Sequence, residues 1–292
     1  MSLMISLVGE QPAPNLLPIR RYKPATVVLA YTDRTERVQT NIASVIGGDT
    51  IPLEVHPYEM ESIRSALQKC IACHGWSKDD LIFNITGGTK PMAIAAYGLA
   101  QSLGALVYYF QTEGGRSIVY RYSFSEDGQV QQYAEPDEIP DSITLDDYLR
   151  LYLGEYTCEP PRNELERAVL DVLSAEKRVD EVMSSVRPRK LSNVEIDFVV
   201  RCKNQVGIGE IKTTGNKEGV DQLTAVAEQR YLGTYIAKFL ISARPFHPHQ
   251  KELAKAYRIT LIELPSYTDA RGVSQPDSAE MLKGILTRLN AF

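Results

Sequence analysis

The sequence has few of the features that define several protein classes. Only four of its 292 residues are cysteines, too few for the disulfide framework that stabilises small secreted proteins. No apolar run approaches the length of about 18 residues that a transmembrane helix needs, and no secretory signal peptide is present. These absences predict a soluble, cytoplasmic protein that has no membrane partner.

One cysteine motif needs an explanation. The run Cys70-Ile71-Ala72-Cys73-His74 matches the C-x-x-C-H pattern of c-type haem attachment. Haem attachment of this type belongs to exported proteins, and Cys70 lies on the apolar stripe of a predicted helix. A zinc site would need two more ligands, but Cys158 and Cys202 are isolated in the sequence. We interpret Cys70 as a buried thiol.

Positive charge is also scarce. The chain carries 32 Lys and Arg against 37 Asp and Glu, which argues against a protein that coats duplex nucleic acid. The deficit lies in residues 1–150, whose net charge is −6, whereas residues 151–292 carry +1. A local basic patch at Arg187, Arg189 and Lys190 is equally consistent with a nucleic-acid contact and with a solvated loop.

The first half of the chain alternates short apolar runs with helical stretches. Strands are expected at residues 4–8, 25–31, 51–56, 81–85 and 105–110, and helices near 15–21, 33–46, 59–73 and 89–102. This alternation predicts a parallel sheet with helices on both faces. Ligands of such sheets bind at the carboxyl ends of the strands, where the strand order reverses.

The loop after the fourth expected strand reads Thr86-Gly87-Gly88-Thr89-Lys90, followed by Pro91. The glycines permit close backbone approach, and Pro91 suits the first turn of a helix. The free N–H groups of that turn, with Lys90 beside them, predict an anion site. The spacing of the Walker P-loop is not met. The alternative is a structural tight turn, which needs only the glycines.

Two more loops leave expected strands. Gly9-Glu10-Gln11-Pro12-Ala13-Pro14-Asn15 is stiffened by its prolines and offers the amides of Gln11 and Asn15 to base edges. Gln111-Thr112-Glu113-Gly114-Gly115 follows the fifth strand. For its two glycines, a hairpin turn into residues 117–122 is the favoured interpretation.

The second half contains Val194-Glu195-Ile196-Asp197, a polar turn at residues 203–205, and Gly209-Glu210-Ile211-Lys212. Both apolar stretches are typical of strands. Strand alternation places Glu210 and Lys212 on one face, and an antiparallel neighbour can bring Asp197 beside Glu210. The alternative for an isolated E-x-K is a surface hairpin with a solvated Glu–Lys pair.

Neighbouring carboxylates repel each other, and a divalent cation is the usual remedy. A hard cation such as Mg²⁺ or Mn²⁺ polarises a phosphodiester and activates a water. Lys212 can hold that water or stabilise developing negative charge. The pair Asp197 and Glu210 therefore indicates metal-assisted phosphodiester chemistry.

Residues 160–263 resemble the PD-(D/E)XK nuclease superfamily. The resemblance rests on Asp197, on Glu210-Ile211-Lys212, and on Asn163-Glu164-Leu165-Glu166 in an upstream helix. It implies that Glu166, Asp197 and Glu210 bind the metal and that Lys212 is catalytic, with Glu164 as the alternative to Glu166. Ile196 stands where the strict pattern has proline. Gln222, in a downstream helix, matches a polar residue that many members carry near the metal, or is a solvated helix residue.

Residues 4–125 resemble the CARF domain, the CRISPR-associated Rossmann-fold sensor. The resemblance rests on the Q-P-x-P-N-L-L-P loop after the first strand and on the T-G-G-T-K loop. CARF followed by PD-(D/E)XK is the plan of the CARF nucleases of type III CRISPR defence, in which two protomers bind one cyclic oligoadenylate across a twofold axis. The implied ligand-binding residues are Gln11, Pro12, Asn15, Thr32, Thr86, Gly87, Gly88, Thr89, Lys90 and Thr112.

Together these observations predict an α/β protein: a Rossmann-like parallel sheet followed by a restriction-endonuclease-like α/β domain. We expect a sensor domain at 4–130, a linker with a short helix at 131–160, and a nuclease domain at 161–292. The expected activity is that of a homodimeric endonuclease that requires Mn²⁺ or Mg²⁺, is activated by cyclic tetra-adenylate, and cleaves DNA or RNA. The alternatives are a non-catalytic cyclic-nucleotide-sensing regulator and a constitutive restriction-like nuclease.

Overall fold

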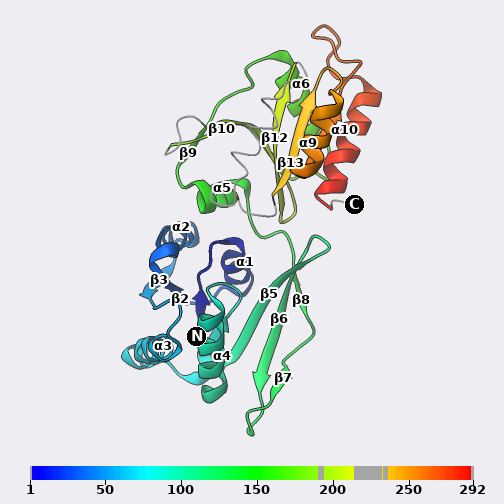
Figure 1. The fold of residues 1–292 in the computed structure, drawn as a ribbon. Coiled ribbons are helices and arrows are strands. Elements are labelled where there is room, and N and C mark those ends of the chain that lie inside the picture. The colour runs from blue at the N-terminus through cyan, green and yellow to red at the C-terminus, as the bar shows by residue number, and fades with distance from the viewer. Residues whose placement is uncertain (1, 190–193, 214–231, 233–235, 291–292) are drawn as a thin grey trace. The chain divides into compact units, whose positions relative to one another are not determined.

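The computed structural model describes the chain except for residues 1, 190–193, 214–231, 233–235 and 291–292 (Figure 1). The chain divides into two compact units, Met1–Ser142 and Ile143–Phe292. Two residues singled out in the sequence, Lys190 and Gln222, lie outside the described residues.

The first unit is built on a sheet with the order β3-β2-β1-β4-β5-β6-β7, and β8 also pairs with β6. Its parallel strands are β1 (Leu3–Leu7), β2 (Thr26–Tyr31), β3 (Asp49–Glu54), β4 (Leu81–Asn84) and β5 (Leu106–Glu113). The chain runs outward from β1 to β3 and then returns to β4. The strand order therefore reverses between β1 and β4, whose carboxyl ends carry the two loops singled out in the sequence.

Helices cover this sheet (Figure 1). They are α1 (Ala13–Tyr22), α2 (Glu36–Ile46), α3 (Met60–His74) and α4 (Lys90–Leu103). Helix α4 begins where the sequence requires it to begin: the Thr89 hydroxyl accepts from the Met92 N–H, and Pro91 lies in the first turn. The core between sheet and helices includes the fully buried side chains of Phe83, Leu67 and Met92. The predicted α/β architecture is confirmed.

Antiparallel strands extend this sheet: β6 (Arg116–Phe124), β7 (Val130–Gln132) and β8 (Asp137–Ile139). Gly114 and Gly115, both with positive φ, form the turn of the β5–β6 hairpin, as their favoured interpretation predicted. Arg21 donates to Asp137 at 2.9 and 3.0 Å, and the Tyr22 hydroxyl donates to it at 2.7 Å. These bonds fix β8 against α1.

The stretch 131–160, expected as a linker, is divided between the units instead. Strands β7 and β8 complete the first sheet, while α5 (Leu145–Leu153) and β9 (Tyr156–Cys158) belong to the second unit. Helix α5 buries Leu145 and Leu149, and β9 pairs with β10, with Cys158 opposite Val186. Apolar burial and strand pairing override the acidic, proline-bearing composition of this stretch.

The second unit has a sheet with the order β14-β13-β12-β11-β10-β9. Its strands are β10 (Glu181–Pro188), β11 (Ile196–Cys202), β12 (Gln205–Lys212), β13 (Ala237–Ser242) and β14 (Ile259–Glu263), and its helices include α6 (Glu164–Ala175), α9 (Pro248–Ala256) and α10 (Gln275–Arg288). Strands β10, β11 and β12 are antiparallel, whereas β12, β13 and β14 are parallel.

The sequence of β12 is explained by its neighbours. A Cβ atom at Gly209 would lie 2.0 Å from the ring of Phe198, so only glycine fits there. Phe198 and Phe239 stack with ring centroids 6.5 Å apart in the core beneath the sheet. Glycine at this position keeps β12 close to β11 and so determines where Glu210 lies.

Two expectations about absent features can be compared with the described residues. In this part of the chain, no helix combines the length and the apolar character needed to cross a membrane. All four cysteines are free, and Cys70 is buried in the first core as interpreted. The His74 ring stacks on Trp76 with centroids 4.3 Å apart, which gives that residue a packing role.

Candidate functional site

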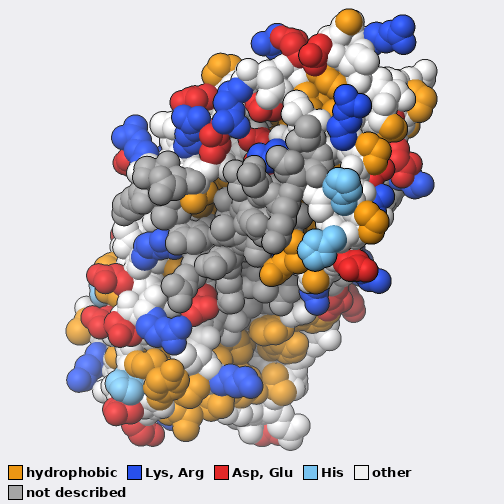
Figure 2. Space-filling view, turned by 45° about the horizontal axis from the view of Figure 1, so that its top comes forward, with side chains coloured by type: hydrophobic (Ala, Val, Ile, Leu, Met, Phe, Trp, Pro, Cys, Tyr) orange, Lys and Arg blue, Asp and Glu red, His pale blue; other side chains and the backbone are white. Residues whose placement is uncertain are grey.

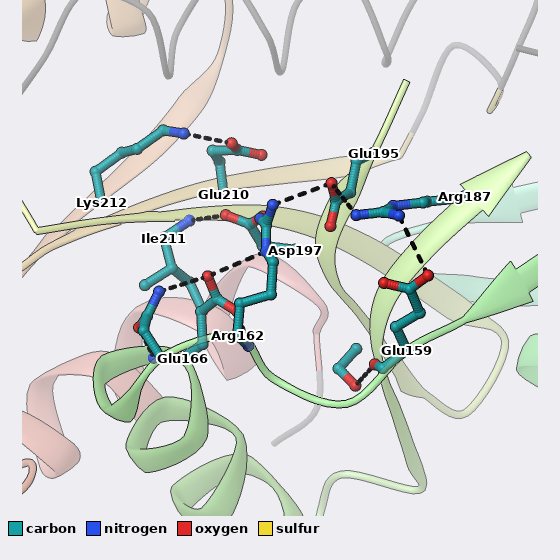
Figure 3. Close-up of polar contacts among 11 residues, drawn as sticks. Glu159, Arg162, Glu166, Arg187, Glu195, Asp197, Glu210, Ile211 and Lys212 are labelled. Carbon is teal, nitrogen blue, oxygen red and sulfur yellow. Dashed lines mark hydrogen bonds and ion pairs between the residues drawn. The ribbon is translucent and has the colours of Figure 1, made fainter. Parts of the chain in front are cut away.

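Three elements of the second unit bring the predicted carboxylates together (Figure 3). Glu166 lies in the first turn of α6, Asp197 on β11 and Glu210 on β12. Their exposures are 3%, 2% and 5%. The β11–β12 register pairs Phe198 with Gly209, and one step further along the same register Asp197 faces Glu210. All three side chains are thus almost fully buried, although a carboxyl group in water at neutral pH is charged.

The start of α6 gives Glu166 and Glu164 different environments. The Asn163 side chain accepts from the Glu166 N–H at 2.9 Å and donates to Glu166 Oε1 at 2.7 Å. The Arg162 N–H donates to Glu166 Oε2 at 2.8 Å. Glu164 is exposed and pairs with Arg167 at 2.8 Å. The helix cap thus fixes the Glu166 carboxylate beside β11 and leaves Glu164 on the outer face.

The strand carboxylates are held by different donors. Asp197 Oδ2 accepts from the Ile211 N–H at 2.7 Å, and Asp197 Oδ1 accepts from Arg162 Nη2 at 2.9 Å. Lys212 Nζ donates to Glu210 Oε1 at 2.7 Å, and a quarter of the Lys212 side chain is exposed. Glu210 and Lys212 share a strand face, as alternation predicts.

Burial disfavours the charged form of the carboxyl groups in this cluster. It raises the pKa of Asp197. Burial, together with the charge of Asp197, raises the pKa of Glu210 to about 7, although Lys212 and Arg162 act in the opposite direction. Burial also opposes the charge of Arg162, but the carboxylates around it outweigh this effect and raise its pKa. The cluster therefore favours any positive charge that enters it.

Arg162 is a site residue that the sequence reasoning missed. Its Nη1 lies 3.1 Å from Glu195 Oε2, an oxygen that also accepts from Arg187 Nη2 at 3.0 Å. Arg187 Nη1 in turn donates to Glu159 at 3.2 Å. Figure 3 shows this chain of ion pairs running from Asp197 toward Arg187. The available signal was an arginine immediately before a capped helix that carries an acidic first turn.

The basic patch expected around Arg187 is therefore paired with carboxylates where the structure describes it. Arg187 contacts Glu159 and Glu195, and Arg189 lies 3.5 Å from Glu155. On the face drawn in Figure 2, described Lys and Arg side chains commonly lie next to Asp and Glu side chains. Paired surface charges of this kind do not form a strong field for a nucleic-acid backbone.

The donor set suits a hard divalent cation, because carboxylate oxygens are the ligands that Mg²⁺ and Mn²⁺ prefer. Among the residues that the structure describes, no three His, Cys, Asp or Glu side chains are grouped as metal ligands. The guanidinium of Arg162 supplies positive charge to Asp197 and Glu195 instead. The carboxylates are thus of the type that binds such a cation, and in this structure Arg162 balances part of their negative charge.

The first unit places its two predicted loops in direct contact at the switch point. A Cβ atom at Gly87 would lie 2.1 Å from the Leu7 carbonyl oxygen, and one at Gly9 would lie 3.0 Å from the Gly88 nitrogen. The loop after β1 and the loop after β4 are therefore packed backbone to backbone. Glycine at residue 87 is required by this close approach.

Asn15 lies inside this arrangement. It is fully buried, and its amide donates to Ser6 Oγ at 2.8 Å and to the Leu7 carbonyl at 2.7 Å. Asn84 donates to the same Ser6 hydroxyl at 3.0 Å and to the Pro14 carbonyl at 3.1 Å. The Asn15 amide nitrogen, which we expected to contact a base, ties the first loop to β1 and β4.

The threonines of the second loop are also used internally. Thr86 Oγ1 donates to Asn84 Oδ1 at 2.7 Å and accepts from the Phe110 N–H at 2.7 Å. The Thr89 hydroxyl caps α4, accepting from Met92 N–H at 3.3 Å and donating to the Pro57 carbonyl. These hydroxyls determine the shape of the loop.

The remaining predicted binding residues differ in exposure. Thr32 is buried, and its N–H donates to Thr35 Oγ1 at 3.0 Å. Pro12 is buried, Gln11 and Gly87 are half-buried, and Gly88, Lys90 and Thr112 are exposed. The exposed residues among the predicted binding set are thus Gly88, Lys90 and Thr112.

A Rossmann-like sheet whose glycine loops meet at its switch point defines a class of nucleotide-binding α/β domains. Residues 3–148, half of the chain, match the Card1 CARF domain, and the chain belongs to that family. No curated protein sequence matches this chain.

Solved structures share the fold over nearly the whole chain. Can2 from Sulfobacillus thermosulfidooxidans, in complex with cyclic tetra-adenylate, is 16% identical with a TM-score of 0.73, covering 97% of each chain. Protein VC1899 from Vibrio cholerae is 14% identical with a TM-score of 0.72, covering 99% of this chain and 98% of that one. A type III CRISPR defence DNA nuclease activated by cyclic oligoadenylate is 18% identical with a TM-score of 0.59, covering 98% of this chain and 51% of that one.

Proposed function

We propose that this protein is a metal-dependent endonuclease of type III CRISPR defence that a cyclic oligoadenylate activates. The observation that carries the proposal is the convergence of Glu166, Asp197 and Glu210, with Lys212 beside them, in a chain of the Card1 CARF family. The order helix, three antiparallel strands, then a parallel strand supports a PD-(D/E)XK core. Two structural neighbours, Can2 in complex with cyclic tetra-adenylate and the type III CRISPR DNA nuclease activated by cyclic oligoadenylate, support it.

Cyclic tetra-adenylate is the proposed activator, bound at the switch point of the first unit. The exposed Lys90 side chain, at the positive N-terminal end of α4, suits phosphates. Gly88 is exposed beside Lys90, Gln11 lies in the loop after β1, and Thr112 is exposed near the end of β5. In a homodimer, a ligand with twofold symmetry would meet the same loops twice.

The chain's own residues would divide the chemistry between them. The Ile211 N–H orients Asp197, and the Asn163 side chain together with the Arg162 N–H orients Glu166. A divalent cation held by the three carboxylates would neutralise phosphodiester charge and acidify the attacking water. Lys212, partly exposed beside Glu210, would position that water or stabilise charge on the phosphate.

Activation requires that the ligand bind the cleaving arrangement more tightly than the resting one, because only such a difference shifts an equilibrium. The two nuclease domains of a dimer would then act on one nucleic acid. The proposal includes both DNA and RNA as substrates, because the proposed chemistry acts on the phosphodiester group that both contain.

The test is a gel assay with Mn²⁺ on plasmid DNA, single-stranded DNA and RNA, with and without cyclic tetra-adenylate. We expect cleavage only with the ligand, and a loss of at least about 100-fold in Glu210→Gln. Glu164→Gln, which removes an exposed carboxylate from the first turn of α6, is the matched control and should cleave normally. Calorimetry should show the same ligand affinity in all three proteins.

Two outcomes would support the alternatives. Cleavage that is independent of added nucleotide would indicate a constitutive restriction-like nuclease. Intact ligand binding without cleavage of any substrate would indicate a non-catalytic regulator whose carboxylate cluster only stabilises the fold.

A further inference from the structure

The guanidinium of Arg162 occupies the centre of the acidic cluster. Nη2 lies 2.9 Å from Asp197 Oδ1, Nη1 lies 3.1 Å from Glu195 Oε2, and Nε lies 3.8 Å from Glu166 Oε1. One cationic side chain therefore faces two of the three carboxylates proposed to hold metal. It contacts them from the segment just before α6, while its backbone N–H holds Glu166.

The two oxygens of Asp197 are not equally available. Oδ2 is held by the Ile211 N–H, a backbone donor of β12 that cannot leave without disturbing the strand. Oδ1 is held by the Arg162 side chain, of which 47% is exposed. A side chain that is half in solvent can rotate away, so Oδ1 is the oxygen that can exchange its partner.

A divalent cation at Oδ1 and a guanidinium 2.9 Å from the same oxygen would repel each other strongly. We propose that Arg162 is a built-in counter-ion that competes with the divalent cation for Asp197 and withdraws toward Glu195 when the cation binds. This inference rests on the proposed function. It assigns to Arg162 a role in setting the affinity of the site for the divalent cation.

Glu195 is suited to receive the guanidinium. Its Oε2 already contacts Arg162, and Arg187 holds that same oxygen at 3.0 Å. Its Oε1 is buried and has no hydrogen-bond partner among the described residues. Figure 3 shows Glu195 and Arg187 on one side of Asp197, with Glu210 and Lys212 on the other. Withdrawal toward Glu195 therefore keeps the positive charge paired and clears the side facing Glu210.

A purely positioning role for Arg162 makes the opposite prediction. If the guanidinium served only to hold Asp197 in a ligating orientation, its removal would loosen the ligand set and weaken metal binding. If it competes with the metal, its removal deletes a cation from the metal's place and strengthens binding. The sign of the change in metal affinity separates the two roles.

The experiment is calorimetric titration of Mn²⁺, without activator or nucleic acid, into the full-length protein and its variants. We expect Arg162→Gln to bind Mn²⁺ on the order of tenfold more tightly than the unmutated protein. Arg167→Gln is the matched control, because Arg167 lies near the start of α6, close in sequence to Arg162, and pairs with the exposed Glu164. It should leave the affinity unchanged. Equal or weaker binding by Arg162→Gln would overturn the proposal.

Glu195→Gln tests the receiving position. Removing that carboxylate should weaken Mn²⁺ binding in the unmutated background and have little effect when Arg162 is already glutamine. If Glu195→Gln changed Mn²⁺ affinity equally in the unmutated protein and in Arg162→Gln, Glu195 would contribute only general electrostatic attraction. That result would contradict the proposed withdrawal of Arg162 toward Glu195.

Two further readouts keep the result decisive. The melting temperature without metal should fall in Arg162→Gln, and its rise on adding Mn²⁺ should exceed that of the unmutated protein. If Arg162→Gln does not fold, Arg162→Lys retains the charge but cannot bridge two carboxylates, and it should also tighten Mn²⁺ binding. An unmutated protein that binds no Mn²⁺ would reject the metal site itself, which is a failure of the proposed function.

Discussion

The two candidate sites of this chain are formed by different kinds of groups, backbone in one and charged side chains in the other. At the switch point of the first unit, the surface is backbone: Gly9, Gly87 and Gly88 pack together, and the nearby asparagine and threonine side chains are engaged in internal hydrogen bonds. In the second unit, the site consists of three almost fully buried carboxylates that pair with the partly exposed side chains of Arg162 and Lys212.

The difference predicts different sensitivities. A backbone site depends on close approach, so it fails when an atom is added. A charged site depends on the balance of burial and pairing, so it responds to neutralisation and to pH. The three predictions below test this contrast at points where each site should respond and the other should not.

The largest effect is expected from Gly87→Ala. The new methyl group would overlap the Leu7 carbonyl oxygen, so β1 and the loop after β4 must separate. We expect a loss of about 3 kcal/mol in the free energy of unfolding of the first unit, and loss of cyclic tetra-adenylate binding. Chemical denaturation and calorimetry measure the two effects.

Gly98→Ala is the matched control for this prediction. Gly98 lies on α4, and a Cβ atom there meets nothing within 4 Å. Alanine in a helix should stabilise the unit by roughly 0.5–1 kcal/mol relative to glycine and leave ligand binding intact. A Gly87→Ala protein that is as stable as Gly98→Ala and binds ligand would show that the loops do not depend on close packing.

Much of this contrast was predictable from local sequence. Apolar runs and their spacing located the strands and helices of the first unit, and the T-G-G-T-K pattern located the loop at its switch point. In the second unit, strand alternation around Asp197 and Glu210 was sufficient to place both carboxylates on one face. Each of these inferences needs only the period of an element and the direction of its neighbour.

What could not be predicted depends on contacts between distant residues. Arg162 reaches Glu195 and Asp197, more than 30 residues away, through a side-chain rotamer that no local pattern specifies. The hydrogen bond from the Asn15 amide nitrogen to Ser6 could not be predicted, because nothing in the loop of Asn15 reveals that Ser6 lies beside it. The acidic stretch near Asp137 resembled a linker because its partners, Arg21 and Tyr22, lie in the first helix.

The second prediction concerns pH, because the stabilities of the two units should change with pH in opposite directions. Burial, then the charge of Asp197, raises the pKa of Glu210 from its ordinary value of 4.5 to about 7. Between these pH values the folded protein binds more protons than the unfolded chain, so the stability of the second unit falls as pH rises. We expect a loss on the order of 2 kcal/mol across this interval in metal-free protein, measured by urea denaturation. Glu210→Gln should remove most of it.

The first unit supplies the opposite case. Hydrogen bonds from Arg21 hold the pKa of Asp137 below its ordinary value of 3.8. The stability that this pairing contributes is therefore present above that value and is lost as pH falls through the lower pKa of the folded state. Asp137→Asn should weaken the first unit at neutral pH and leave the pH response of the second unit unchanged. A common pH response of both units would contradict the contrast.

The smallest effect is expected from Lys90→Ala. Lys90 is exposed at the start of α4, where its charge adds to the positive end of the helix without being buried. Its removal should weaken cyclic tetra-adenylate binding by about tenfold, reduce the salt dependence of that binding, and leave the unfolding free energy unchanged. Lys78→Ala is the control, because Lys78 precedes β4 and so lies at the opposite end of the strand. A loss far beyond tenfold would mean that the first site also depends mainly on charge, whereas no loss would leave recognition of the phosphates to the backbone N–H groups alone.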